Sequence, residues 1–109
     1  MPITEEEIQR AVDYLRDSAR SAAQARAEYE YLEPWKKTVR AKATLASGAK
    51  TVAEREAEGE ASPEYAEALL AWKAAVEAWE YIRGLRNAAE ARIQAWQTES
   101  ANQRGAWKA

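Results

Sequence analysis

The sequence contains no cysteine and no histidine. These absences exclude disulfides, thiolate nucleophiles and imidazole bases, and they leave the serines without the histidine that activates them in hydrolases. Phenylalanine is also absent, and only four glycines and three prolines occur in 109 residues. The glycines are too scattered to form a phosphate-binding loop. We therefore expect a protein that is not an enzyme and that holds no metal and no cofactor.

Long apolar runs and a strong net charge are lacking as well. The first residues, Met1 to Glu5, become acidic at once, so we expect neither a signal peptide nor a membrane anchor. The formal net charge is -2, which is too small to steer the whole molecule onto nucleic acid, and any such binding would need a local patch. We expect a cytoplasmic protein that contacts no membrane and takes no small-molecule substrate.

The abundant residues are strong helix formers. Alanine makes up about a quarter of the chain, and Glu, Arg, Lys, Leu and Gln fill much of the rest. This bias is typical of long helices and coiled coils. Apolar residues recur at steps of three and four, and strand alternation is nowhere sustained. The fold class is therefore predicted to be all-α.

The first long helix is predicted over residues 4–46. It begins at a capping box, in which Thr4 accepts a hydrogen bond from the third helical amide and Glu7 reaches back to the cap. Gly48 follows its end and is available for a left-handed cap. Pro34 lies inside this range, where it removes one backbone donor, so we expect a kink near residue 34.

A short charged helix and a second long helix complete the prediction. The short helix spans residues 52–58, and the second long helix spans residues 63–102, with Ser62 as its N-cap. A frayed tail is expected over residues 103–109. Two long helices joined by a short segment predict an antiparallel hairpin that forms a single domain over residues 1–109.

The apolar stripes of this hairpin are narrow and rich in alanine, so a lone hairpin would bury little. We therefore predict a dimer with four-helix or coiled-coil-like packing. Gly84 and Ala88 are two small residues four positions apart on one helix face. Either they mark the point where two helices of a dimer cross, or Gly84 is simply tolerated within the helix. The positions predicted for the core or the dimer interface are Trp72, Trp79, Gly84, Ile93 and Trp96.

Charges of opposite sign gather on the two sides of the predicted bend. Residues 35–50 carry five basic residues and no acidic one, whereas in residues 54–67 six glutamates oppose one arginine. The two runs either neutralise each other or leave a basic face beside a tryptophan for nucleic-acid phosphates. The residues predicted to bind DNA or a partner protein are Trp35, Lys36, Lys37, Arg40, Lys42, Arg83, Arg86 and Arg92.

The predicted arginine site has a structural alternative, and the acidic segment raises the question of a metal site. The arginines near the second apolar stripe can instead cover apolar surface with their stems and pair with neighbouring glutamates. The carboxylates of Glu54, Glu58 and Glu64 are the residues from which a magnesium site would have to be built. We favour a solvated acidic segment over a metal site for these three residues, because such metal sites in helical bundles usually add histidines.

Four stretches of the chain resemble, in the same order, a family of small phage and prophage proteins. They are residues 25–33 (ARAEYEYLE), 53–57 (AEREA), 62–65 (SPEY) and 88–98 (AAEARIQAWQT). The resemblance covers residues 20–104. Pro34 and Gly84 depart from the family pattern, in which a glutamate and a tryptophan are usual. Proteins of this family are typically found near phage replication and recombination genes, and the family supplies no catalytic residues.

This resemblance implies a non-catalytic accessory protein of phage DNA replication or recombination in the cytoplasm of a bacterial host cell. It would bind DNA or a replication or recombination protein. One alternative is an inhibitor of a host nuclease or defence complex that acts through the acidic segment, and another is a structural or assembly coiled-coil protein. The DNA hypothesis predicts that affinity falls steeply with salt and that Lys36→Glu with Arg40→Glu abolishes binding.

Overall fold

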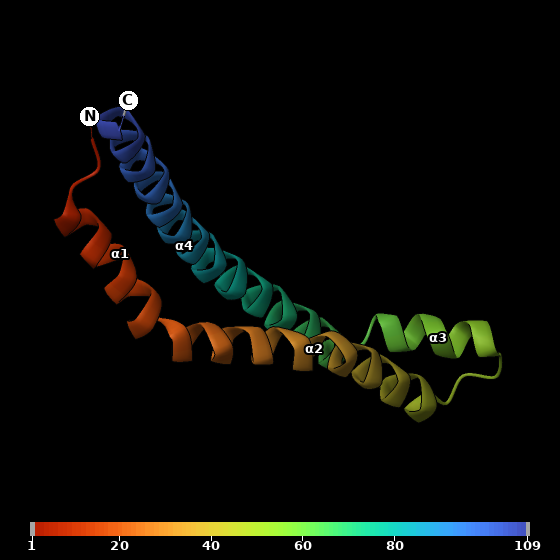
Figure 1. Ribbon diagram of the computed structural model, residues 1–109. Helices are drawn as coiled ribbons and strands as arrows, with labels where there is room; N and C mark the ends of the chain where they lie inside the picture. Colours follow the sequence, from red (N-terminus) through yellow and green to blue (C-terminus); the bar gives the residue numbers. More distant parts are fainter. Residues whose placement is uncertain (1, 109) are drawn as a thin grey trace. The chain divides into compact units, whose positions relative to one another are not determined.

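The computed structural model describes residues 2–108 and the side chains of residues 2–106. These residues form helices and no strand, which confirms the predicted all-α fold (Figure 1). The helices are α1 (Glu5–Asp17), α2 (Ala19–Ala46), α3 (Val52–Glu60) and α4 (Pro63–Lys108). Within the part of the chain that the structure describes, none of them combines the length and the apolar character that a bilayer span requires.

Side-chain caps begin three of the four helices. Thr4 Oγ1 accepts a hydrogen bond from the amide of Glu7 (3.1 Å), and the Glu7 carboxylate accepts one from the amide of Thr4 (3.4 Å). Thr51 Oγ1 accepts from the amide of Glu54 (3.1 Å), and Ser62 Oγ accepts from the amide of the third residue of α4 (3.2 Å). The capping box at α1 and the serine cap at α4 are thus confirmed.

The predicted helix over residues 4–46 is two helices in the structure, with the break at Ser18. The backbone of Ser18 has φ -89° and ψ -4°. Its amide still donates to the carbonyl of Tyr14, and its carbonyl still accepts from the amide of Ala22, both at 2.8 Å. Serine favours such helix ends because its side chain competes with the backbone for hydrogen bonds.

α2 continues through Pro34. Pro34 is exposed, so the carbonyl that loses its donor lies on the side of the helix where water can replace the missing bond. The Thr38 hydroxyl donates an additional hydrogen bond to the carbonyl of Pro34 at 3.3 Å.

The cap after α2 and the ends of α3 and α4 differ from the sequence prediction, and α3 ends at Glu60 rather than at residue 58. The left-handed cap predicted at Gly48 is wrong, because no glycine of the described chain has a positive φ. After the last residue of α2, Ala46, the amide of Ser47 donates to the carbonyl of Thr44 (3.2 Å) and the Ser47 hydroxyl accepts from the amide of Ala49 (3.1 Å). α4 continues to Lys108 rather than ending at residue 102, and the last residue of the predicted frayed tail lies outside the described residues.

The chain divides into two compact units. Unit 1 comprises Met1–Ala23 and Tyr81–Ala109, and unit 2 comprises Gln24–Glu80. In unit 2, α2 and the first part of α4 are antiparallel, and α3 connects them.

In unit 1, α1 lies antiparallel to the second part of α4. Near its start, the amide of Ile3 donates to the Glu99 carboxylate at 3.5 Å, and near its end the carbonyl of Leu15 accepts from the Arg86 guanidinium at 2.7 Å. The sequence numbers rise along α1 while they fall along α4, which fixes the direction.

Each unit has a thin core made mostly of alanine. The buried apolar residues are Ile8, Ala11 and Ala22 in unit 1 and Leu32, Ala68 and Ala75 in unit 2. No described side chain is completely buried. The tryptophans of α4 with described side chains are only half-buried. Each helix therefore packs on its neighbour through a narrow apolar face that is rich in alanine, as expected from the sequence.

Candidate functional site

α3 lies beside the end of α2 (Figure 1), and the backbones of the two helices come close to each other. Gly59 of α3 is buried there, and a Cβ atom on it would collide with the Thr44 hydroxyl and lie 3.0 Å from the amide nitrogen of Thr44 and 3.1 Å from the carbonyl oxygen of Arg40. The Ser47 hydroxyl donates to the Glu58 carboxylate across the same contact. Only glycine allows this approach, so α3 folds back along α2 instead of extending away from it.

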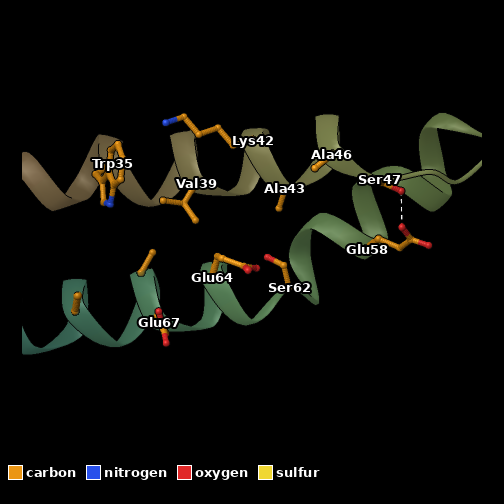
Figure 2. A pocket seen from close by; sticks show the side chains of 12 residues that line it. Trp35, Val39, Lys42, Ala43, Ala46, Ser47, Glu58, Ser62, Glu64 and Glu67 are labelled. Carbon is orange, nitrogen blue, oxygen red and sulfur yellow. Dashed lines mark hydrogen bonds between the residues drawn. The ribbon is translucent and has the colours of Figure 1, made fainter.

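Beside this contact lies a groove of about 770 Å³, which we call the acidic groove. Its apolar lining consists of Trp35, Val39, Ala43, Ala46, Ala68 and Ala71. Its charged lining consists of Lys42, Glu58, Glu64 and Glu67. In Figure 2, Val39 and Ala43 point from α2 toward the helix that carries Glu64, and the Glu64 carboxylate turns into the space between them.

The groove has a surplus of negative charge, with three glutamates against one lysine. Glu58 is held by Ser47. Glu64 and Glu67 have no ion-pair partner among the side chains of residues 2–106, and Lys42 places its ammonium 5.1 Å from the centre of the Trp35 ring. Two carboxylates are therefore available at the edge of an apolar floor. This arrangement suits an amphipathic segment with apolar residues on one side and Lys or Arg beside them.

Lys36, a residue predicted to bind phosphate, is used inside unit 2. Its ammonium lies 3.7 Å from the centre of the Trp72 ring and 3.2 Å from the Glu33 carboxylate. Only 14% of its side chain is exposed. A cation between a ring and a carboxylate has most of its charge compensated, so Lys36 contributes more to the packing of α2 on α4 than to an outer basic surface.

The other basic residues near the bend differ in their surroundings. Arg40 lies 3.8 Å from the Glu60 carboxylate and 6.0 Å from the centre of the Tyr65 ring, so it ties α2 to α3 and α4. Lys37 and Lys42 are exposed. The structure thus brings the predicted basic run together on α2 but leaves only part of it directed at solvent.

Sequence reasoning missed an aromatic pair on α2. Tyr31 and Trp35 stack with their ring centres 6.1 Å apart and their planes at 14°. Tyr31 is 60% exposed. The spacing of four residues was the signal in the sequence, because side chains four apart are neighbours on a helix. The sequence predicted the acidic segment as a possible binding surface for an inhibitor, but not that Glu64 and Glu67 lie on one groove with Trp35.

The three predicted arginines belong to unit 1, whereas the basic run of α2 belongs to unit 2. Arg86 is half-buried, and its guanidinium donates to the carbonyl of Leu15 and to the Ser18 hydroxyl, each at 2.7 Å. Arg83 and Arg92 are exposed. Arg86 therefore holds the break between α1 and α2 together.

The positions predicted for the core or the dimer interface separate into two groups. Four of them are half-buried, namely Trp72, Trp79, Ile93 and Trp96. The fifth, Gly84, is exposed, and a Cβ atom on it would meet no atom within 4 Å. In the single chain, therefore, no described neighbour requires a glycine at this position. Whether it serves a dimer is a separate prediction.

The described residues 2–108 contain no group of three acidic side chains placed to hold one metal ion. No protein-family model, curated protein or solved structure matches this chain. The resemblance to the phage family therefore stays a prediction, and the functional argument rests on the geometry of the acidic groove.

Proposed function

We propose that the protein is a non-catalytic accessory protein of phage DNA recombination or replication that binds a partner protein through the acidic groove of unit 2. The phage context comes from the sequence resemblance. The choice of a protein partner rests on one observation, an apolar floor edged by Glu64 and Glu67 without ion-pair partners among the described residues. The complementary ligand is an amphipathic helix with leucine-like residues on one side and Lys or Arg beside them.

DNA is the second candidate, supported by the Tyr31–Trp35 stack with Lys42 beside it. Proteins bind single-stranded nucleic acid by stacking bases on aromatic rings and by placing lysines beside the phosphates. Two features weigh against it. Lys36 and Arg40 are already engaged with acidic and aromatic groups inside unit 2, and the carboxylates of the neighbouring groove repel phosphates.

The inhibitor hypothesis uses the same surface, because Glu58, Glu64 and Glu67 of the groove belong to the acidic segment. An inhibitor and an accessory protein differ in what the partner does after binding. Binding measurements with peptides and DNA identify the surface, and an assay of the captured partner's activity with and without this protein distinguishes the two.

The test is fluorescence anisotropy with defined probes. One probe is a labelled helical peptide with leucines on one face and arginine and lysine beside them (the basic peptide). Its control is the same peptide with glutamate in place of each arginine and lysine (the acidic peptide). Labelled single- and double-stranded DNA are measured in parallel, at low and near-physiological salt. We expect binding of the basic peptide, no binding of the acidic one, and no binding of DNA at near-physiological salt.

Charge reversal then locates the surface. Glu64→Lys with Glu67→Lys is expected to lower the affinity for the basic peptide at least about tenfold, which corresponds to a loss of about 1.4 kcal/mol in binding free energy. The matched control is Glu28→Lys with Glu77→Lys, which makes the same change in net charge at exposed positions of unit 2 outside the groove. Equal losses of affinity in both variants would mean that overall charge, and not the acidic groove, determines peptide binding. Tight, salt-sensitive DNA binding by the wild type would replace this proposal with the DNA hypothesis.

A further inference from the structure

The second part of α4 carries a row of residues that is exposed at the edge of its contact with α1. Tyr81, Leu85, Ala88 and Arg92 follow one another at steps of four, three and four, so they share one helix face. Tyr81 is 71% exposed and Leu85 is 42% exposed. These are large apolar side chains in water, in a unit whose own core is mostly alanine.

A small groove runs along this row, between α1 and α4. Its volume is about 230 Å³, and we call it the alanine groove. The residues that matter for its character are Ala11, Ala88, Ala89, Leu85, Glu7 and Arg92. Small side chains on both walls let another helix come close, since the distance between packed helices is set by the side chains at the contact.

The charges at the alanine groove complement themselves under two-fold symmetry. Glu7 lies on the groove together with Arg10 and Arg92. In an isologous dimer the same patch meets its own copy, so a two-fold axis can bring the carboxylate of one chain to an arginine of the other. A patch with both signs and an apolar centre favours a second copy over a ligand of one charge.

We propose that a second copy of this chain docks on the alanine groove of unit 1 and forms a symmetric dimer. Leu85 and Ala88 lie at the centre of the interface, Tyr81 covers one end, and Arg92 pairs with Glu7 of the other chain. The acidic groove belongs to the other unit, so the two proposals can fail independently.

The experiment is analytical ultracentrifugation of the full chain across the micromolar range. We expect the wild type to sediment with twice the mass of 12.2 kDa. Leu85→Glu is expected to weaken the dimer by about 100-fold or more, because each substitution occurs twice in a symmetric interface. The matched control is Leu70→Glu, at a leucine of α4 in unit 2 that is 67% exposed and lines neither groove.

A second variant and a check of folding complete the test. Ala88→Arg places a long charged side chain at an exposed position, where the single chain has room for it, and it should also yield monomer. Far-ultraviolet circular dichroism must show unchanged helicity in all three variants for their masses to be compared. A monomeric wild type overturns the proposal, and so does a dimer that Leu70→Glu disrupts while Leu85→Glu and Ala88→Arg leave it intact.

Discussion

At the scale of single residues, Gly59 is the position where the smallest change should have the largest effect. Adding one methyl group with Gly59→Ala places a carbon against the hydroxyl of Thr44 and against the backbone of Thr44 and Arg40. The hydroxyl can rotate away, but the backbone cannot. We expect a loss of about 1–3 kcal/mol in the free energy of unfolding from this overpacking, measured by urea denaturation, although alanine is the better helix former.

The matched control is the same substitution at Gly84, where a Cβ atom meets nothing within 4 Å. Gly84→Ala should stabilise the chain by about 0.5–1 kcal/mol through helix propensity alone. If both variants gained stability, the close contact between α3 and α2 would not exist in solution.

Arg86 is a second residue with a defined structural role. Arg86→Met keeps much of the apolar stem but removes the hydrogen bonds to the Leu15 carbonyl and the Ser18 hydroxyl. We expect a loss of about 2–3 kcal/mol, because hydrogen bonds to a charged group contribute about 1.5–3 kcal/mol each and this site is only half-buried. Ser18→Ala removes one of the two bonds and should cost less in the same denaturation assay. An equal loss for both would mean that the bond to Leu15 contributes nothing.

Residue-level prediction from the sequence succeeded where the partner is close along the chain. The caps at Thr4 and Ser62 involve residues three positions away and were predicted with their partners. The partners of Lys36 and Arg86 were not predictable, because the Trp72 ring and the Ser18 hydroxyl come from distant segments. The Arg86 and Ser18 side chains are separated by 68 residues.

At the scale of helices, Pro34 provides the clearest test of the fold. The structure keeps α2 continuous through this exposed position. Pro34→Ala therefore restores a missing backbone donor in an intact helix and should raise the free energy of unfolding by about 1–3 kcal/mol. The midpoint of urea denaturation reports this directly. A decrease would indicate that proline defines a turn that alanine cannot replace.

The break at Ser18 was not predictable from local sequence, and the reason is physical. The residues around Ser18 include two alanines and an arginine that favour helix, so local propensity does not require an end there. What stabilises the end is the Arg86 guanidinium on the carbonyl of Leu15, an interaction that exists only after α4 has packed beside α1. The start of α3 at Val52, by contrast, depends on the local cap at Thr51, and the sequence predicted it at the same residue.

At the scale of the whole chain, the residues of the candidate site were only partly predictable. The opposite charge runs at the bend were evident, and Trp35 and Lys42 of the acidic groove were predicted to bind a partner. The groove itself depends on Gly59, which lets α3 fold back so that its end and the start of α4 lie beside α2. No periodicity in the sequence encodes that fold-back.

This geometry also revises which lysines a DNA experiment should change. Lys36→Glu with Arg40→Glu would disturb the interactions with Trp72 and Glu60, so weaker binding could reflect weaker packing. Lys37→Glu with Lys42→Glu changes exposed residues of the same run. If DNA is bound at low salt, this variant should abolish binding with unchanged helicity. Each lysine–phosphate interaction that a substitution removes should reduce the slope of log affinity against log salt by about 0.7 for single strands.

The dimer proposal has a consequence for the stability of the entire molecule. When folding and association are coupled, the unfolding free energy depends on protein concentration by mass action. A tenfold higher concentration should add about 1.4 kcal/mol per dimer and raise the melting temperature of the wild type by a few degrees. Leu85→Glu should melt at a temperature independent of concentration, because this variant has no partner to release on unfolding. A wild-type melting temperature that does not change over a hundredfold range in concentration would mean that the thin alanine core of each unit is sufficient to fold the single chain, and that the exposed row on α4 does not bind a second copy in solution.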